Sequence, residues 1–442
     1  MNGVIKNNKK IINAWCMYDW ANSVYSLVIT SAIFPVYYQS VTTLKSDDGS
    51  VVKDTVNFLG FEIVNSVLYS YSLSFSFLLI ALISPVLSSV ADYSGRKKLF
   101  MRIFCYTGAF ACMSLFFFTE YTVSFSIMMF ILASIGYSGS LVFYNAYLPE
   151  IATEDRFDRI SAKGFSLGYT GSVLLLIFNL SMILYPGAYG IDSTALATRI
   201  SFLTVGLWWL GFATYTFYYL PSNVYGKRPA ENIFSKGFIK LKMVLSQLKH
   251  QSLLKKFLFA FFFYNMGVQT VIYLASIFGE KELKLSSELL IATILVLQIV
   301  AVAGSFLFSY ISGKIGNIYA IMISVGVWII VTVLAYFITS ATEFILLAGL
   351  VGIVMGGIQA LSRSTYAKII PEDTTDHASY FSFYDVADKI SIVVGTFFYG
   401  LINQITGSMR ISSITLAVFF IIGLIFLSKI PSKKIYSVRI NN

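Results

Sequence analysis

The sequence has 442 residues, of which 57% are hydrophobic, 17% aromatic and only 12% charged. Soluble domains contain about 25% charged residues, so this composition excludes a protein that folds in water around ordinary cores. The same composition excludes intrinsic disorder and a disulfide scaffold, and the 3 cysteines all lie in apolar segments, so no disulfide outside the membrane is implied. Two histidines are too few for a metal cluster, and the phosphate-binding loop of ATP-driven pumps does not occur. We therefore expect a polytopic membrane protein without metal or cofactor.

Twelve apolar segments are long enough to cross a bilayer, which takes about 20 residues in a helix. Their apolar character is continuous and does not alternate, so we expect helices and not the strands of a membrane barrel. The sequence thus predicts an all-α membrane protein with twelve transmembrane helices, at residues 13–39, 63–91, 99–119, 122–148, 164–186, 199–220, 256–280, 287–312, 318–338, 341–367, 378–405 and 409–430.

Lysine and arginine are distributed unevenly between the two sides of these spans. Of the 32 basic residues, 25 fall on the side of the chain termini, six fall on the other side, and Lys389 lies within a span. Cytoplasmic segments are enriched in Lys and Arg, so this bias predicts that both termini lie inside. Membrane topology therefore accounts for the net charge of +10, and we expect no nucleic-acid partner. The N-terminus does not have the pattern of a signal peptide, so the first span is kept as a transmembrane helix.

The two halves of the chain echo each other on either side of a long basic connection. Pro149–Glu150 follows the fourth span and Pro371–Glu372 follows the tenth, the same place in each half. Parallel six-helix repeats are typical of secondary transporters whose substrate site lies between the halves. We expect three parts, with the linker resting on anionic lipid: an N-terminal six-helix bundle at 1–220, an amphipathic cytoplasmic linker at 221–255, and a C-terminal six-helix bundle with a short basic tail at 256–442.

Polar and ionisable side chains occur within several spans, where each is costly and therefore a functional candidate. Those of the first span fall on one face of a helix, and those of the seventh and tenth repeat at helical spacing. The alternative for the amide side chains is that they only hydrogen-bond neighbouring helices. The candidates for substrate binding or coupling are Trp15, Asp19, Asn22, Tyr144, Asn145, Asn265, Gln269, Gln359, Arg363, Asp385 and Lys389.

We predict that Asp19 and Lys389 form the electrostatic centre of the site. Asp19 would take a coupling proton or the ammonium group of a substrate, and Lys389 or Arg363 would meet a carboxylate. At about 1.5 Å per residue, Asp19 and Lys389 lie about 10 and 17 Å deep, a difference that a lysine stem can largely span. The eleventh span also holds Asp385 and Asp388, and an open alternative is that Lys389 pairs with Asp385, one turn away.

A charged loop follows the second span and reads DYSGRKK from Asp92 onward. We predict a gating role for Asp92, Gly95, Arg96 and Lys97. Charge-assisted bonds of Asp92, Arg96 and Lys97 would hold the inner ends of the two halves together and would break when the protein opens inward. The alternative is that Arg96 and Lys97 only anchor the chain on the positive inner side.

The loop Asp92–Lys98 resembles the motif that follows helix 2 of the major facilitator superfamily. Three further stretches, Trp15–Ser26, Tyr144–Gly171 and Gly356–Glu372, resemble the UMF1 family of bacterial transporters, which is related to the Atg22-like vacuolar effluxers. The resemblance covers nearly the whole chain. It implies the major facilitator fold, alternating access, and a cavity lined by helices 1, 4, 7 and 10.

These observations together predict a secondary transporter and not an enzyme. We expect it to move a small polar or zwitterionic solute, an amino acid or peptide-like molecule, by proton-coupled efflux. The alternatives are a major facilitator exporter of drugs or sugars, and a non-transporting membrane sensor. The expected partners are the solute, protons and membrane lipid. We expect a monomer in the bacterial inner membrane, or in the vacuolar membrane if the chain is eukaryotic.

Overall fold

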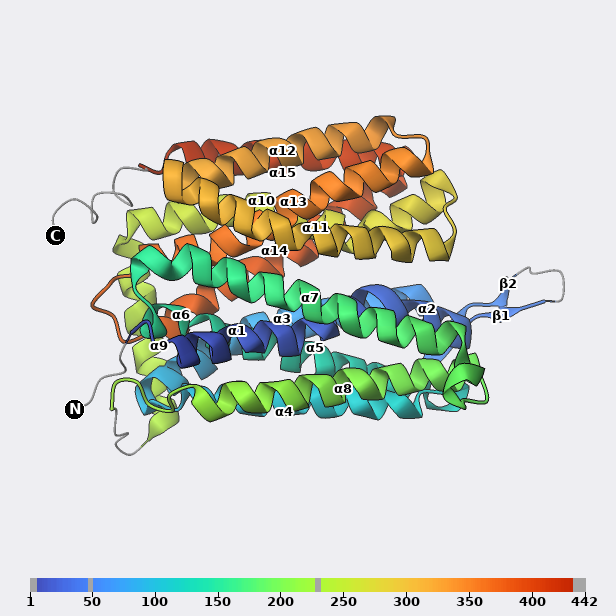
Figure 1. Cartoon of the computed structure of the whole chain (residues 1–442), viewed down its shortest axis with the longest axis horizontal. Helices are drawn as coiled ribbons and strands as arrows, with labels where there is room; N and C mark the ends of the chain where they lie inside the picture. The colour runs from blue at the N-terminus through green and yellow to red at the C-terminus, as the bar shows by residue number, and fades with distance from the viewer. Residues whose placement is uncertain (1–5, 47–50, 227–231, 432–442) are drawn as a thin grey trace.

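The computed structural model describes residues 6–46, 51–226 and 232–431. Long helices run side by side in two bundles that lie one above the other in Figure 1. The N-terminal bundle contains α1 (Lys9–Val24), α2 (Ile33–Thr42), α3 (Asn65–Ser94), α4 (Lys97–Ser114), α5 (Val123–Asn145), α6 (Leu148–Ile151), α7 (Phe157–Leu184) and α8 (Thr194–Tyr219). The C-terminal bundle contains α10 (Ser252–Leu283), α11 (Ser287–Ile315), α12 (Asn317–Phe337), α13 (Ala341–Ile369), α14 (His377–Thr406) and α15 (Met409–Ser428).

The predicted spans match these helices closely. Within the described residues, 11 helical segments are long and apolar enough to cross a membrane. The predicted span 378–405 corresponds to α14, which is less apolar because it carries Asp385, Asp388 and Lys389. The helical membrane fold is confirmed, whereas the count of twelve spans and the inward position of the termini stay predictions.

The first membrane segment is irregular at its centre. Residues Tyr25–Ala32, between α1 and α2, form a π-helical stretch, η1. Within it the Ser31 hydroxyl donates to the carbonyl of Ser26 at 2.9 Å. Such wide turns are rare and are found often at functional sites. The stretch begins about two turns beyond Asp19, so it adjoins the predicted site.

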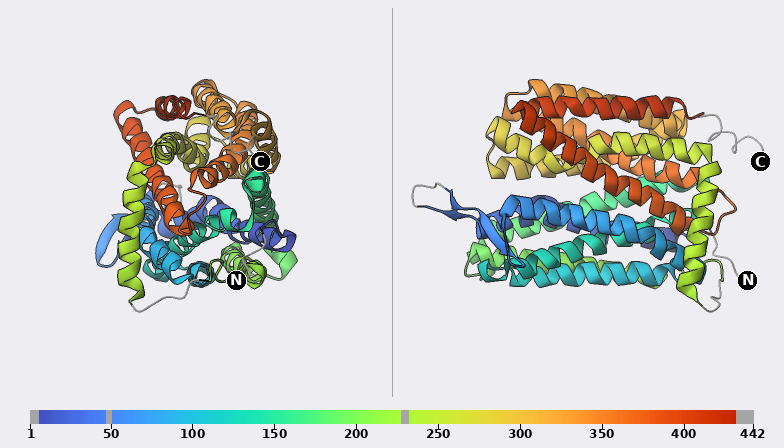
Figure 2. Two further views of the ribbon diagram at one scale, coloured as in Figure 1. Left: turned by 90° about the vertical axis from the view of Figure 1, so that its left-hand side faces the viewer. Right: turned by 180° about the vertical axis from the view of Figure 1, so that it is seen from behind.

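The two ends of the molecule differ. Helix α9 (Ile233–His250) lies across one end at a steep angle to the long helices, as the right-hand view of Figure 2 shows. We call this the linker end, and α1 begins there while α15 ends there (Figure 1). The opposite end, which we call the hairpin end, carries two short antiparallel hairpins formed by β1 (Leu44–Lys45) with β2 (Val51–Lys53) and β3 (Thr55–Phe58) with β4 (Phe61–Val64).

The two hairpins lie mainly in the connection between the first two predicted spans, and no strand is predicted there from the sequence. β3 and β4 are joined by Leu59 and Gly60, both with positive φ (51° and 88°). Two consecutive residues with positive φ make the tight turn that suits a β-hairpin. Strands of two to four residues are too short to be recognised from alternation alone.

Helix α9 contacts both bundles. Gly237 packs directly on Val90 of α3, and Lys240 Nζ lies 2.6 Å from Asp376 Oδ1, just before α14. The linker therefore spans the two halves at this end. The predicted boundaries of the three parts stay predictions. Residues 227–231 of the linker and 432–442 of the predicted basic tail lie outside the described residues.

Close packing of α11 against α13 depends on a glycine. A Cβ atom on Gly356 of α13 would collide with the carbonyl group of Ala301 in α11. We expect Gly356→Val to lower the melting temperature of the detergent-solubilised protein, because an overpacked side chain costs about 1–3 kcal/mol. Gly349→Val on the same helix is the control, since nothing lies within 4 Å of the Cβ added there. Equal melting temperatures for the two variants would contradict this packing.

Candidate functional site

A buried ion pair between Asp19 of α1 and Arg363 of α13 joins the two bundles. Arg363 Nη1 lies 3.1 Å and Nη2 3.2 Å from Asp19 Oδ2. The two side chains are only 3% (Arg363) and 6% (Asp19) exposed. The hydroxyl of Tyr144 on α5 donates to the same carboxylate oxygen at 2.7 Å. The charge of Asp19 is thus compensated by donors from both bundles, as a charge buried in a membrane protein requires.

Aromatic rings and a serine hold the guanidinium group of Arg363. Its carbon atom lies 4.7 Å from the ring centroid of Trp15 and 4.1 Å from that of Phe165. The hydroxyl oxygen of Ser161 on α7 accepts from Nε and its carbonyl accepts from Nη2, both at 2.9 Å. Trp15 also stacks on Tyr144, with 4.4 Å between the centroids. The arginine therefore uses its planar face and its edge at once, which a lysine could not do.

A second ionic centre, which we call the Asp388 cluster, lies between α10 and α14. It comprises Asn265, Gln269, Asp385, Asp388 and Lys389. Lys389 Nζ lies 2.7 Å from Asp388 Oδ2 and 3.6 Å from Asp385 Oδ1. Asp388 Oδ1 accepts from Asn265 Nδ2 at 2.8 Å and from Gln269 Nε2 at 3.3 Å. The cluster thus gathers two carboxyl groups, one ammonium group and two amides.

The two ionic centres face a common region between the bundles. Phe77 of α3 covers Lys389, whose Nζ lies 5.5 Å from the ring centroid. Phe77 also meets Tyr273 of α10, with 6.4 Å between the centroids. Tyr137 of α5 is within electrostatic range of both Asp19 and Lys389. A solute between the bundles would therefore meet charges from both centres.

The predicted pair between Asp19 and Lys389 is wrong in this structure. Asp19 contacts Arg363, whereas Lys389 contacts Asp388 and Asp385. The Arg363 side chain extends from α13 to Asp19 on α1, whereas Lys389 binds two carboxyl groups of its own helix, α14. The alternative that Asp385 neutralises Lys389 is the one the structure supports, with Asp388 as the nearer partner.

The other predicted residues lie at these centres or close to them. Asn145 Oδ1 accepts from Arg363 Nη1 at 3.4 Å. Gln359 on α13 accepts from the hydroxyl of Tyr169 on α7 at 2.5 Å, which is another contact across the bundles. Asn22 is buried on α1, and its Nδ2 atom has no hydrogen-bond acceptor among the described residues. Their part in substrate binding stays a prediction.

Three residues of the two centres were missing from the predicted set. Asp388 had a usable signal, because it is a carboxyl group within an apolar segment and next to Lys389. Ser161 and Phe165 had none, since serine and phenylalanine are frequent throughout membrane helices. Only their position on α7, facing Arg363, gives them a role.

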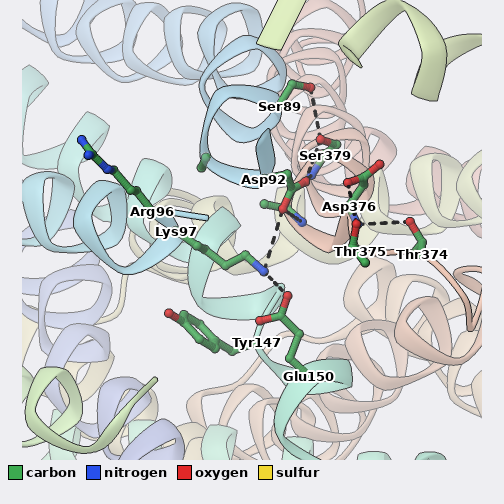
Figure 3. A network of polar contacts seen from close by, with 12 residues as sticks. Ser89, Asp92, Arg96, Lys97, Tyr147, Glu150, Thr374, Thr375, Asp376 and Ser379 are labelled. Atoms are coloured by element: carbon green, nitrogen blue, oxygen red, sulfur yellow. Dashed lines mark hydrogen bonds and ion pairs between the residues drawn. The ribbon is translucent and has the colours of Figure 1, made fainter. Parts of the chain in front are cut away.

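A further set of contacts fastens the linker end, where Asp92 at the end of α3 meets the first turn of α14 (Figure 3). Asp92 Oδ2 accepts from the backbone N–H and from the hydroxyl of Ser379, both at 2.7 Å. Asp92 Oδ1 accepts from the N–H of Ala378 at 3.3 Å. A carboxylate is favoured at the N-terminus of a helix, where N–H groups are free and the helix dipole is positive. Asp92 thus connects the two bundles, as the gating prediction requires.

The other predicted gating residues do not cross between the bundles. Lys97 lies 4.0 Å from Asp92 and forms an ion pair with Glu150 of α6, so it acts within the N-terminal bundle. Gly95 ends α3 with a φ of 69°, which favours glycine and lets the chain turn into α4. Arg96 is exposed and points away from these contacts (Figure 3). The prediction that Arg96 holds the halves together is therefore wrong.

A second fastening contact at the same end involves Asp158, in the first turn of α7. Its Oδ2 lies 2.7 Å from Lys368 Nζ of α13 and accepts from the Ser312 hydroxyl of α11 at 3.1 Å. Asn317 Nδ2 donates to Oδ1 at 2.8 Å. Sequence reasoning missed this contact because Asp158 lies in a charged stretch between two predicted spans. With Asp92 and the Asp19–Arg363 pair, it closes the linker end of the described structure.

Removing one partner of the Asp19–Arg363 pair leaves the other charge buried alone. We expect Asp19→Asn and Arg363→Gln each to lower the free energy of unfolding by about 3–5 kcal/mol, and the double variant to lose less than the sum. Denaturant unfolding in detergent measures these values. Glu62→Gln is the control, because the side chains of the Lys53–Glu62 pair are 50% and 62% exposed, and exposed pairs contribute little to stability. Strictly additive losses would show that the pair is not a direct one.

Loss of the Asp92 charge should loosen the linker end. The probe is a cysteine at Ser89, whose hydroxyl lies 3.1 Å from that of Ser379. The native cysteines Cys16, Cys105 and Cys112 are buried and give a low background. In the Ser89→Cys background, we expect Asp92→Asn to raise the rate of alkylation by a water-soluble maleimide about tenfold, because charged hydrogen bonds contribute about 1.5–3 kcal/mol. Arg96→Gln should leave the rate unchanged, and an equal increase there would refute the specific role of Asp92.

Comparisons with known proteins agree with this architecture. A family model described as "Vacuole effluxer Atg22 like" matches residues 7–436. The "Uncharacterized MFS-type transporter YxiO" of Bacillus subtilis is 31% identical over 432 residues, with 97% of each chain covered. Autophagy-related protein 22 of Pyricularia oryzae is 21% identical, covering 91% of this chain and 73% of that one. The solved structure of the proton:xylose symporter XylE has a TM-score of 0.68 at 13% identity and covers 97% of this chain and 98% of that one. The protein therefore belongs to the Atg22-like family of membrane transporters, within the major facilitator superfamily.

Proposed function

We propose that the protein moves a small zwitterionic or otherwise polar solute, an amino acid or peptide-like molecule, out of the compartment that its linker end faces. The observation that carries this proposal is the presence of two ionic centres, the Asp19–Arg363 pair between the bundles and the Asp388 cluster between α10 and α14. A zwitterion has an ammonium and a carboxylate group a few ångströms apart. Asp388 and Lys389 in one centre and Arg363 in the other supply charges of both signs that complement such a solute.

The cost of buried charge supports an ionic solute over an uncharged one. Each ionised group within a membrane span costs several kcal/mol unless it is paired. Sugars are bound through neutral hydrogen bonds, and they give no reason to keep Lys389 and Arg363 buried. A drug exporter is the second candidate, because Trp15, Tyr144 and Phe165 provide aromatic surface. These rings already pack on Arg363 or on one another, so they are less available to an apolar ligand.

The contacts at the linker end support alternating access. Asp92, Asp158 and the Asp19–Arg363 pair all join the bundles, and all three contacts must separate before a solute can enter from that end. A ligand shifts such an equilibrium only through contacts that differ between the two states. A solute that pairs with Arg363 would weaken its bond to Asp19, so binding and opening would be coupled.

The same proposal gives the protein a cellular setting. We propose that it acts as a monomer in a bacterial cell membrane with both termini in the cytoplasm, because basic residues concentrate at the linker end. The exposed lysines and apolar side chains of α9 favour contact with anionic lipid there. Protons are the proposed coupling ion. The bacterial relative supports this membrane, whereas the fungal relatives support a vacuolar one.

Transport in liposomes tests the proposal directly. Purified protein is reconstituted, and uptake of labelled amino acids is measured with and without an imposed pH gradient. We expect at least one amino acid to be taken up, with a rate that rises when the gradient is imposed. Lys389→Met should lower that uptake at least about tenfold, because Asp388 loses its cation. Glu282→Gln is the control, since Glu282 pairs with Arg410 away from the ionic centres. Uptake of xylose or an apolar dye, without uptake of any amino acid, would favour the alternatives.

A further inference from the structure

The Asp388 cluster has more acidic groups than cations. Both carboxylate oxygens of Asp388 have hydrogen-bond partners, since Oδ2 binds Lys389 and Oδ1 accepts from Asn265 and Gln269. Asp388 and Lys389 therefore form a neutral and well-bonded pair. Asp385 is the additional carboxyl group, and no second cation belongs to the cluster.

Asp385 itself is poorly compensated. Its Oδ1 lies 3.6 Å from Lys389 Nζ, which is longer than a hydrogen bond. Its Oδ2 is buried and has no hydrogen-bond partner among the described residues, and the side chain is 7% exposed. An ionised carboxylate here would be a nearly unpaired charge within a membrane span. Groups in such a position usually become neutral, because protonation costs less than burial of the charge.

Among the described residues, the other helices around α14 bring no further cation to Asp385. The charges that act on Asp385 are those of Lys389 and Asp388. Tyr273 of α10 and Tyr137 of α5 face those two residues, and Arg363 of α13 is engaged by Asp19. The charged residues of the remaining neighbours lie at the two ends, where α3 has Asp92, α9 has its lysines and α15 has Arg410.

We propose that Asp385 holds one exchangeable proton and that an amino group of the solute displaces it. The ammonium group of the solute binds Asp388 and takes the place of Lys389. Lys389 then moves to the carboxyl group of Asp385, which releases its proton to water as it becomes a carboxylate. The cluster is neutral before the exchange, and afterwards Lys389 and the ammonium group of the solute together neutralise the carboxylates of Asp385 and Asp388. One bound amine therefore releases one proton.

The exposed fractions of the three charged side chains indicate the order in which a solute would contact them. Asp388 is 18% exposed, whereas Asp385 is 7% and Lys389 is 6% exposed. A solute therefore reaches Asp388 first and reaches Asp385 only through the movement of Lys389. The existing contact at 3.6 Å shows that this movement is short.

This inference rests on the proposed function and makes it more specific. It assigns the coupling proton to Asp385 and not to Asp19, whose charge is satisfied by Arg363 and Tyr144. It also defines the solute as one that carries an amino group. Exchange of one solute for one proton makes the protein an antiporter, so a proton gradient directed inward would drive efflux.

Infrared difference spectroscopy of the purified protein tests for the proton without any solute. A protonated buried carboxyl group gives a C=O stretching band that shifts in heavy water. We expect this band in the wild type and in Glu282→Gln, with loss of the band at high pH and in Asp385→Asn. Asp385→Glu should restore a band at a shifted position, which shows that the variants fold. A band that persists in Asp385→Asn, or that is absent from the wild type, overturns the assignment.

Proton release on binding tests the exchange. L-alanine is added to weakly buffered protein in detergent, and propionate, which lacks the amino group, is the matched probe. We expect one proton per bound L-alanine in the wild type and none in Asp385→Asn, although that variant still binds. Asp388→Asn should weaken binding at least about tenfold. Equal proton release from Asp385→Asn, or release by propionate, refutes the exchange. If no amino acid binds the wild type, the proposed function and the exchange both fail, and the infrared experiment still decides whether Asp385 holds a proton.

Discussion

The ion pair between Asp19 and Arg363 is the interaction on which the closed state of this protein depends. Two opposite charges buried between helical bundles attract strongly, because the surroundings screen them poorly. Burial also costs hydration, which the contacts with Tyr144 and Ser161 offset. When the bundles separate, water can hydrate both groups again, so the pair breaks at a moderate cost. The pair is therefore stable when buried and separable when hydrated, which suits a contact that opens during the proposed transport cycle.

Two contacts at the linker end join the end of one helix to the first turn of a helix in the other bundle, with the acid and the serine donor in opposite places. Asp92 at the end of α3 binds the first turn of α14, where Ser379 supplies the donors. In the opposite direction, Asp158 supplies the acid from the first turn of α7, and Ser312 at the end of α11 is a donor. The acid thus lies at the end of a helix in the first contact and at the start of a helix in the second, and both acids belong to the N-terminal bundle.

The two ionic centres differ in whether their charged residues lie on two bundles or on one helix. Arg363 and Asp19 lie on different bundles, so their contact reports whether the bundles are together. Asp385, Asp388 and Lys389 lie on one helix, and in the proposed exchange their balance of charge depends on protons and on the solute. A transporter needs both kinds of centre, because binding must be coupled to opening without the charges being left unpaired in either state. Helix α9, attached to α3 and to the start of α14, adds a connection between the bundles outside the membrane region.

The sequence alone determined the membrane class, the positions of the helices and most of the ionisable candidates. Continuous apolar segments and rare charges within them are local features, and the cost of burying a charge makes each one visible without a structure. Only the tertiary structure decided which charges pair. Asp19 binds Arg363 and not Lys389, Arg96 points to solvent, and Asp158 becomes a contact between bundles, because each outcome depends on how α1, α7, α13 and α14 are placed side by side. Partners that are more than a hundred residues apart are set by helix packing, which sequence spacing does not encode.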